Sequence, residues 1–242
     1  LPPTATGSVA NDDAPSAPAC TAIRRRREIR TLSKEERTMF VSAIRQLQSG
    51  PQPNEYDRIV SLHWNARKTA HGWPAFLPWH RAYVREFERR LQSINPTIAV
   101  PYWDWTYDSQ APEMSPIWKA DWFGGVGRQS DGCVVDGPFA KWRPYYPTPH
   151  CLLRVWDGGN FMTSFHSPEV VSALSVDSTS YVQYNRRAEA PQHDKVHIAV
   201  GGDMVTIYSP NDPVFWLHHA FVDKLWWEWQ RQREENYEAY SG

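Results

Sequence analysis

The sequence has no run of 18 consecutive apolar residues, which excludes a membrane-spanning helix. It also has almost no net charge. The formal charge of the 242 residues is −1, so the overall charge gives no basis for binding nucleic acid or an acidic membrane surface. Four arginines at residues 24–27 are followed at once by Glu28, and we interpret this short run as a solvated stretch. We therefore expect neither nucleic acid nor a membrane as a partner.

Cysteine is scarce, with three residues in the chain. Cys133 and Cys151 could close a loop within one domain, which leaves Cys20 alone or paired with a residue outside this chain. This odd count does not settle the redox compartment. The chain begins with Leu1 rather than Met, as it would after removal of a leader, and we expect a protein that is secreted or that works in a secretory compartment.

Tryptophan is in excess, with 13 residues. Many of these stand beside His, Asp or Pro, as in Trp79-His80 and Trp103-Asp104-Trp105. Such rings could fill a core or form rigid walls around a site, and one wall can do both.

The chain divides into two parts by composition. Residues 1–19 contain mostly Pro, Ala, Ser and Thr with almost no large apolar side chain, which predicts a flexible N-terminal arm. We expect residues 20–242 to form a single domain, a size that allows a substantial core.

Apolar residues recur at helical spacing in several segments of this domain. Ser33 and Glu36 form a capping-box pattern before the first of them. The spacing and the flanking Gly and Pro residues predict helices over residues 34–49, 55–69, 79–94, 168–174, 192–199 and 213–235. The helical periodicity is absent over residues 101–160, which predicts a long loop region with few short strands. The expected fold class is mainly α, with a four-helix bundle core.

Six of the nine histidines fall into two sets, one formed by His63, His71 and His80 and the other by His193, His197 and His219. His193 and His197 stand four residues apart, which places both imidazoles on one face of a helix, close enough to share a metal ion. His219 and its neighbour lie inside an apolar run and need a polar partner there. A metal ion is one such partner and a carboxylate is another.

The first set lies within 18 residues and is framed by aromatic residues. These three histidines could bind a metal, or they could be core residues bonded to main-chain carbonyls. Ligation by imidazole alone favours copper, zinc, iron or nickel over magnesium or calcium.

Two regions of the chain resemble a known family. The segments HGWPAFLPWHRAYVREFERRL and PYWDW resemble the first copper-binding region of tyrosinases, catechol oxidases and molluscan haemocyanins. The segments HDKVHIAVGGDM and SPNDPVFWLHHAFVDKLWWEWQ resemble the second. The resemblance runs from Arg24 to Arg231 and implies a bundle that holds two copper ions. It also implies oxidation of phenols or catechols to o-quinones by O2, with catechol oxidation expected and monophenol hydroxylation as a further possibility.

The resemblance implies a ligand set: His63, His71 and His80 for the first copper, and His193, His197 and His219 for the second. It places His218 beside the second copper as a supporting neighbour rather than a ligand. It also implies that Asp223 orients a ligand or anchors its helix. His150 and His166 match no ligand.

The chain departs from the family after the first ligand of the second copper. Members of the family often have Asn at this position, and with a Glu about two helical turns earlier it is proposed to hold a water that deprotonates monophenols. Here the two positions are Asp194 and Asn185, with Glu189 nearby but displaced. We therefore expect Asp194 to act as the catalytic base. Ile207 matches a position over the second copper, where it could narrow the access of substrate or simply pack in a loop.

The same histidines are compatible with two other functions. An oxygen carrier of the haemocyanin type would have the same copper site, shielded from substrates, and a zinc-binding or structural relative would have lost the copper chemistry. The absence of a repeat and of a further domain after the last helix argues against the carrier, and we expect an open, active form. The sequence does not identify the phenol or the oligomeric state.

Overall fold

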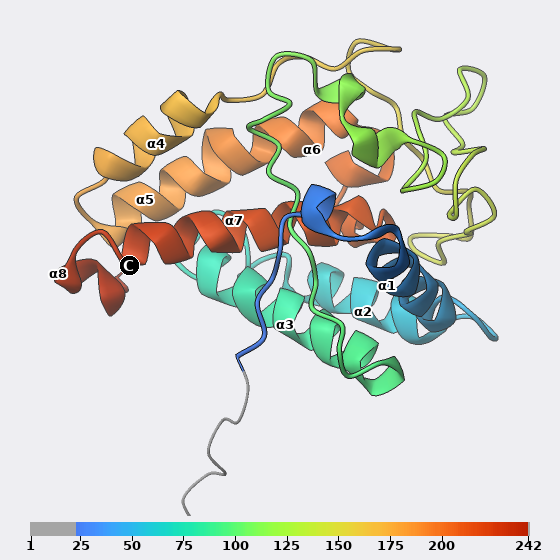
Figure 1. The fold of residues 1–242 in the computed structure, drawn as a ribbon, viewed down its shortest axis with the longest axis horizontal. Helices are drawn as coiled ribbons and strands as arrows, with labels where there is room; N and C mark the ends of the chain where they lie inside the picture. Colours follow the sequence, from blue (N-terminus) through green and yellow to red (C-terminus); the bar gives the residue numbers. More distant parts are fainter. Residues whose placement is uncertain (1–22, 242) are drawn as a thin grey trace, which may run out of the picture.

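The computed structural model describes residues 23–241, so the predicted arm at 1–19 and Cys20 lie outside the described residues. Over the described range the chain is mainly helical, as predicted (Figure 1). Extended pairing within this range is limited to two isolated bridges, Glu28 with Tyr102 and Cys133 with Leu153.

Four helices form the core of the bundle: α2 (Glu55–Ala66), α3 (Phe76–Ile94), α6 (Asp194–Val200) and α7 (Val214–Gln230). In Figure 1, α7 crosses the middle of the molecule, with α2 and α3 on one side and α6 on the other. Phe87 of α3 stacks on Trp216 of α7, with ring centroids 3.9 Å apart. The predicted four-helix core is confirmed.

Local capping starts the first two helices where the sequence predicts them. The Ser33 hydroxyl accepts from the Glu36 N–H, and the Glu36 carboxylate accepts from the Ser33 N–H, at the start of α1 (Lys34–Leu47). Asn54 and Asp57 form the same reciprocal pair before α2. Each pair satisfies main-chain N–H groups that a helix leaves free at its first turn.

Helix α3 begins at Phe76, three residues before the predicted start at Trp79. Pro78 occupies the third position of the helix, where a main-chain N–H would have no helical partner in any case. The earlier start extends α3 by almost one turn toward the loop that carries His71.

The predicted helix at 192–199 is replaced by a longer and less regular segment. Helix α5 (Tyr181–Arg187), which we did not predict, leads into a π-helical turn, η4 (Ala188–His193), and then into α6. Ala190 inside this turn is extended, with φ −127° and ψ 121°. Pro191 explains this conformation, because a residue before proline is disfavoured in the helical region.

Other helix ends differ from the prediction by a few residues. Helix α2 ends at Ala66 rather than residue 69, and α4 (Pro168–Val176) continues two residues further than expected. Helix α7 stops at Gln230 rather than 235, and a separate short helix, α8 (Glu234–Tyr237), follows. The buried Asn236 amide donates to the Trp229 carbonyl at 3.0 Å, which turns the chain back at this point.

The long loop region at 101–160 is held to the bundle by a buried ion pair. Arg154 donates from Nε and Nη2 to the two oxygens of Asp212, at 2.6 and 2.9 Å, and both side chains are fully buried. The same arginine donates to the Phe123 carbonyl, and Asp212 accepts from the Val214 N–H at the start of α7. The possible pairing of Cys133 with Cys151 is confirmed, since the two form a disulfide within this region.

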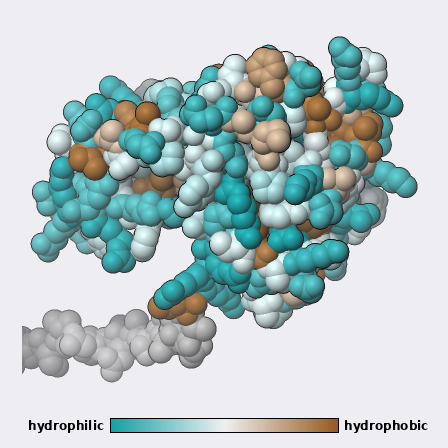
Figure 2. Space-filling model, turned by 45° about the horizontal axis from the view of Figure 1, so that its top comes forward, coloured by the Kyte–Doolittle hydropathy of each residue, from teal (hydrophilic) through white to brown (hydrophobic). Residues whose placement is uncertain are grey.

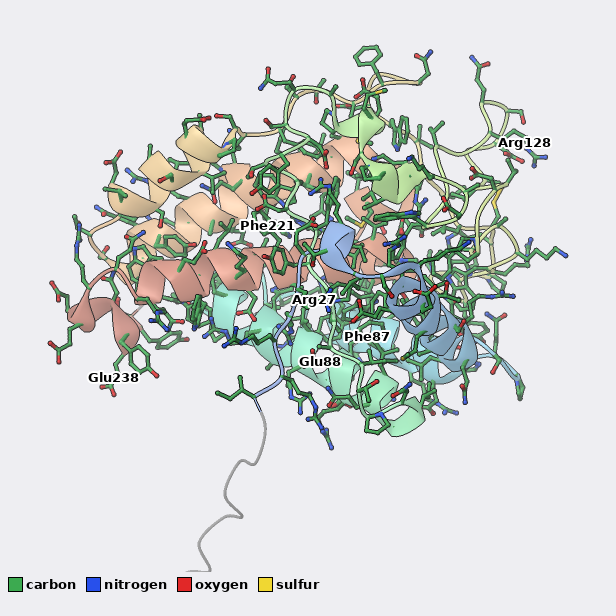
Figure 3. All side chains as sticks on the ribbon, viewed as in Figure 1. Arg27, Phe87, Glu88, Arg128, Phe221 and Glu238 are labelled. Carbon is green, nitrogen blue, oxygen red and sulfur yellow. A yellow bond between two sulfur atoms is a disulfide. The ribbon has the colours of Figure 1, made fainter. Side chains whose placement is uncertain are left out.

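The N-terminal segment also packs on the bundle. Arg26 pairs with Glu88 of α3, labelled in Figure 3, and with Asp223 of α7, which also pairs with Arg81. Our interpretation of the arginine run as a solvated stretch is therefore wrong for Arg26. Asp223 anchors its helix, the second of the two roles expected for it, because its partners are arginines rather than a histidine.

The face shown in Figure 2 is mostly hydrophilic, with apolar side chains in small separate groups. Within residues 23–241, none of the helices combines the length and apolar character that a bilayer crossing requires.

Candidate metal centre

The first histidine set converges from two helices and the loop between them. His63 comes from α2, His80 from α3, and His71 from the connecting segment. The ring centroids of His63 and His71 lie 4.8 Å apart, and those of His71 and His80 lie 4.9 Å apart. One ring nitrogen from each of the three lies within 4.8 Å of the others, so one ion could contact all three.

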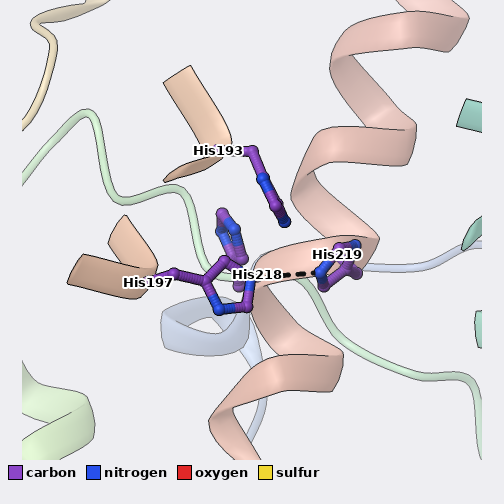
Figure 4. A group of neighbouring side chains, drawn as sticks. All are labelled: His193, His197, His218 and His219. Carbon is purple, nitrogen blue, oxygen red and sulfur yellow. Dashed lines mark hydrogen bonds between the residues drawn. The ribbon is translucent and has the colours of Figure 1, made fainter. Parts of the chain in front are cut away.

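The second set contains four histidines rather than the predicted three (Figure 4). His193 ends η4 and His197 lies on α6, while His218 and His219 are consecutive on α7. One ring nitrogen of each lies within 4.8 Å of the others. The structure therefore brings His218 into the cluster itself.

The two sets share a wall. The rings of His80 and His219 stack with centroids 4.4 Å apart and planes inclined by 14°. Phe215 lies 4.1 Å from His219 and Phe76 lies 4.9 Å from His193, measured between ring centroids. The arrangement is a pair of adjoining nitrogen sites enclosed by aromatic rings.

Hydrogen bonds fix the tautomer and direction of most of these rings. The Nδ1 atoms of three histidines lie at 2.5–2.8 Å from main-chain oxygens that can only accept a hydrogen bond: His63 to Ile207, His80 to Phe76, and His197 to Met204. The Nδ1 atom of His193 lies 3.0 Å from a carboxylate oxygen of Asp194. Each Nδ1 therefore carries the hydrogen, and each Nε2 keeps its lone pair for a metal.

The spacing of these lone pairs fits a bound cation. The Nε2 atoms of His63 and His80 lie 3.4 Å apart, and both carry lone pairs because both Nδ1 atoms donate elsewhere. The Nε2 atoms of His197 and His219 lie 3.3 Å apart. Two donors on one ion, with bonds of about 2.0 Å at a tetrahedral angle, lie about 3.3 Å apart. The residues present therefore fit metal ions in both sets.

Buried nitrogens without a partner support the same conclusion. Among the described residues, His193 Nε2 and both ring nitrogens of His218 have no hydrogen-bond partner. Buried polar atoms are almost always paired, and a metal ion supplies the missing partner for a ring nitrogen that faces a site.

The electrostatic environment keeps the rings neutral. Burial, together with the neighbouring histidines, lowers the pKa of His63 to about 3 and that of His71 to about 4. Burial and the neighbouring rings also hold the pKa values of His80, His197 and His219 well below their usual range. Neutral imidazole is the form that binds copper, zinc, iron or nickel.

A cavity of about 250 Å³ opens onto both histidine sets and is lined by residues of each, with Asp194, Ile198, Val205 and Ile207 among its walls. A larger cavity of about 580 Å³ lies beside the disulfide region, but no histidine lines it. The smaller cavity is therefore the candidate functional one, because histidines of both sets line it.

Asn185 and Glu189 lie near the position where the resemblance implies a water-binding glutamate, and both make other contacts. Asn185 is buried and its amide donates to the Trp73 carbonyl at 3.1 Å. Glu189 accepts from the Gly72 N–H at 2.6 Å, which ties η4 to the residue that follows His71. Burial, together with the charge of Asp194, raises the pKa of Glu189 to about 7. The sequence did not assign this positioning role to Glu189.

The two remaining histidines lie outside both sets, as expected. His150 lies 3.0 Å from a carboxylate oxygen of Asp203 and 2.7 Å from the Thr148 carbonyl. His166 belongs to neither cluster of candidate metal ligands among the described residues.

Comparison with known proteins gives the family. A family model described as the common central domain of tyrosinase matches residues 53–232. A tyrosinase from Streptomyces antibioticus is 38% identical, over 84% of this chain and 81% of its own length. A tyrosinase from Streptomyces glaucescens is 40% identical over the same shares.

Solved structures agree in fold. A polyphenol oxidase from Thermothelomyces thermophila superposes with a TM-score of 0.71 at 25% identity, covering 85% of this chain and 69% of that one. A functional unit of octopus haemocyanin superposes with a TM-score of 0.62 at 23% identity, over 85% of this chain and 52% of that one, which shows likeness of fold alone. The chain belongs to the tyrosinase family of oxidoreductases, whose members oxidise phenolic compounds with O2 at a pair of copper ions.

Proposed function

We propose that the protein oxidises catechols to o-quinones with O2. The observation that carries this proposal is the cavity that joins the two histidine sets to the surface. His63 and His71 of the first set line it, as do His193 and His197 of the second, so a flat phenol ring has access to both metals. An oxygen carrier needs the opposite arrangement, with a centre shielded from phenols.

We propose that His63, His71 and His80 hold one copper and that His193, His197 and His219 hold the other. Ring orientation separates His219 from His218. An imidazole lone pair lies in the ring plane, so two stacked parallel rings do not point at the same ion. His218 stacks on His193 with planes inclined by 18°, whereas the ring of His219 is inclined by 67° to that of His193. This geometry favours His219 as the ligand and leaves His218 as its neighbour.

The bound copper ions would supply the binding of O2 and accept electrons from the phenol. The protein supplies the position of every imidazole. The carbonyls of Ile207, Phe76 and Met204 and the carboxylate of Asp194 hold four rings with Nε2 facing the centre. In the overall reaction one O2 oxidises two catechols, and the four electrons and four protons released reduce it to two waters.

We further propose that Asp194 is the base that deprotonates monophenols. Its Oδ1 atom accepts from His193, and the carboxylate has no other hydrogen-bond partner among the described residues. Its side chain is 48% exposed and lines the cavity, so the second oxygen can accept a phenolic proton. A substrate that is already a catechol depends less on this step, because its hydroxyl groups are more acidic.

The test compares Asp194→Ala and Asp194→Asn with the unmodified protein on one monophenol and its matching catechol. Both variants remove the base, but Asn can still accept from the His193 N–H. We expect both to reduce monophenol turnover far more than catechol turnover. Oxygen consumption distinguishes the reactions, since a monophenol uses one O2 for each quinone and a catechol uses half as much. Equal losses on both substrates would refute the role of Asp194.

We also propose that the protein works outside the reducing cytosol. The Cys133–Cys151 disulfide supports this proposal, because disulfides persist mainly in oxidising compartments. Protein isolated from its source without reductant should leave these two cysteines unreactive toward a thiol reagent after denaturation. Full reactivity of both would contradict the proposal.

A further inference from the structure

We propose that Asp203 is a positioning residue for the copper centre: it fixes the loop whose main-chain carbonyls direct one imidazole of each histidine set, and a protonated His150 holds it in place. Asp203 belongs to neither set and does not line the cavity over them. This role rests on the proposed copper ligands, and it connects the region around the disulfide to the centre.

Two of the carbonyls that direct the rings lie three residues apart, in the loop after α6. The Met204 carbonyl accepts from Nδ1 of His197 at 2.5 Å. The Ile207 carbonyl accepts from Nδ1 of His63 at 2.7 Å. His197 belongs to the second set and is turned toward His219 in Figure 4, whereas His63 belongs to the first. A shift of this one loop would therefore turn a ring in both sets.

Asp203 stands directly before these two carbonyls and joins their loop to the segment at 150–153. Its carboxylate is buried, and Oδ2 accepts from the Leu153 N–H at 2.9 Å, while its own N–H donates to the Leu153 carbonyl at 3.0 Å. The main-chain carbonyl of Asp203 accepts from the N–H and the hydroxyl of Thr206, at 3.0 and 2.9 Å. These bonds shape the turn that leads to Ile207.

The other end of the loop is tied to the same carboxylate. Asn211 is fully buried, and its amide donates to Oδ1 of Asp203 at 2.9 Å and to the Tyr146 carbonyl at 2.8 Å. Residues 203–211 carry both ring-directing carbonyls, and the two ends of this stretch meet at Asp203. Removing the carboxylate therefore releases both ends at once.

A glycine lets the loop approach the segment that it contacts. A Cβ on Gly202 would lie 2.2 Å from the Leu153 carbonyl oxygen, far inside contact distance. The φ of Gly202 is +58°, which glycine adopts without a steric penalty. The Cys133–Cys151 disulfide holds the facing segment two residues before Leu153. The two backbones are therefore in direct contact at Asp203.

His150 supplies a positive partner for this carboxylate. Its Nε2 lies 3.0 Å from Oδ1 of Asp203, and its Nδ1 lies 2.7 Å from the Thr148 carbonyl. A carbonyl and an ionised carboxylate only accept hydrogen bonds, so the ring satisfies both when it carries hydrogen on both nitrogens. The hydrogen bond to Asp203 raises the pKa of His150 above its ordinary value, while burial and the charge of Arg143 oppose this increase.

This arrangement predicts an inverted dependence of copper affinity on pH. A free histidine loses its proton near pH 6.5, whereas His150 in the folded protein keeps it to a higher pH. As the pH rises through this raised value, His150 loses the hydrogen that one of its two contacts needs. The rings of His63 and His197 are already neutral, because their pKa values lie far lower. We therefore expect copper affinity to fall as the pH rises, whereas deprotonation of ligands would raise it.

The experiment measures the affinity of the copper(I)-loaded protein for its two ions by competition with a copper(I) chelator, which requires no turnover. Asp203→Ala should lower the affinity of both sites about tenfold or more, as for other residues that orient ligands. Asp203→Asn keeps one of the two acceptor oxygens and should lower both affinities by a smaller factor. The asparagine variant carries the test if the alanine variant does not fold.

Asp57→Ala is the matched control. Asp57 is also a buried carboxylate that accepts from main-chain N–H groups, those of Asn54 and Tyr145. It contacts neither of the carbonyls at 204 and 207. This variant should lose stability toward urea and keep both copper affinities, which separates a positioning role from a general loss of structure.

His150→Gln tests the protonated partner at a partly exposed position. The Gln amide can still donate to Asp203, but it does not titrate. The copper affinity of the unmodified protein should fall as the pH rises from about 6.5, and that of the variant should stay level. An NMR titration of the ring should give His150 a pKa above about 6.5 in the unmodified protein and a lower value in Asp203→Asn.

The outcomes separate this inference from the proposed ligands. Fewer than two copper ions bound by the unmodified protein would overturn the ligands and this role with them. With two bound, equal losses in Asp203→Ala and Asp57→Ala would refute the positioning role alone, and so would a loss at one site only. A pH profile shared by His150→Gln and the unmodified protein would refute the role of the His150 proton.

Discussion

The Nε2 atoms of His63 and His80 face each other at 3.4 Å, while the Nδ1 atom of each ring donates to a main-chain carbonyl. Two lone pairs at this distance repel unless a cation lies between them. A proton could serve, but burial holds the pKa of His63 near 3 and that of His80 well below its usual range. The fold therefore presents a site that a metal ion stabilises and that neutral pH leaves unprotonated.

The copper-free protein should lose stability as the pH falls. An unfolded histidine takes up a proton near pH 6.5, whereas His63 in the folded state remains neutral down to about pH 3. The unfolded state thus binds more protons between these values. Each such imidazole lowers the free energy of unfolding by about 1.4 kcal/mol per pH unit within this window, with no loss above it.

Urea unfolding of the copper-free protein at about pH 7 and about pH 5 measures this loss. The variant His63→Gln should show a shallower decline than the unmodified protein, because it lacks one of the contributing rings. Equal stability at the two pH values would contradict the depressed pKa values.

The copper content of two neighbouring variants tests the ligand assignment on α7. His219→Gln should bind about one copper per chain after loading and dialysis, because the second site loses a ligand. His218→Gln should retain about two, since its ring is parallel to that of His193 and does not aim at the same ion. Elemental analysis gives both values, and the reverse result would assign His218 as the ligand.

Glu189 should affect the first copper through the position of His71. Glu189→Ala removes the acceptor of the Gly72 N–H, so the loop that carries His71 loses its tie to η4. Glu189→Gln keeps an oxygen acceptor at the same place. We expect copper affinity at the first site to fall about tenfold or more in the Ala variant and much less in the Gln variant, as for other residues that orient ligands. Competition with a chelator measures this affinity, and similar losses in both variants would argue for charge rather than position.

Arg154 should be among the most sensitive positions for stability. Arg154→Met leaves Asp212 buried without its ion partner and removes the donor to the Phe123 carbonyl. Breaking one side of a buried ion pair costs about 3–5 kcal/mol in the free energy of unfolding. Chemical denaturation of the copper-free protein, with its disulfide intact, gives this value. Combining Arg154→Met with Asp212→Asn should cost less than the sum of the two single changes, and strict additivity would contradict direct coupling.

The sequence predicted the parts of the fold that depend on local pattern. Ser33 with Glu36 marks the start of α1, and the spacing of His193 and His197 places two candidate ligands close together. Helix α5 was missed because its seven residues are too few to show a helical period. Its buried face is set by tertiary contact, as in the stacking of Tyr184 on Trp229 at 4.7 Å. The helix propensity of the local sequence does not reveal such a tertiary contact.

The candidate site was likewise predictable only where it depends on sequence motifs. The six proposed ligands stand in motifs, and the structure brings all of them together. The contact between Glu189 and Gly72 joins residues 117 positions apart, and the pair of Arg154 and Asp212 spans 58. No short-range pattern connects these residues, so only the folded arrangement reveals that they support the centre. The closeness of His218 to the second set, by contrast, was expected from the resemblance, which places it beside the second copper as a neighbour rather than a ligand.

Oxygen uptake by the copper-loaded protein with a simple catechol, beside His197→Ala as the control, tests the proposed oxidase function most directly. His197 is fixed by the Met204 carbonyl and lies 3.3 Å from His219 between their Nε2 atoms, so its loss opens the second site. We expect rapid catalytic uptake by the unmodified protein and none above background by the variant. Two firmly bound coppers with reversible oxygen binding and no catalytic uptake would contradict the proposed function and assign the protein to oxygen carriage.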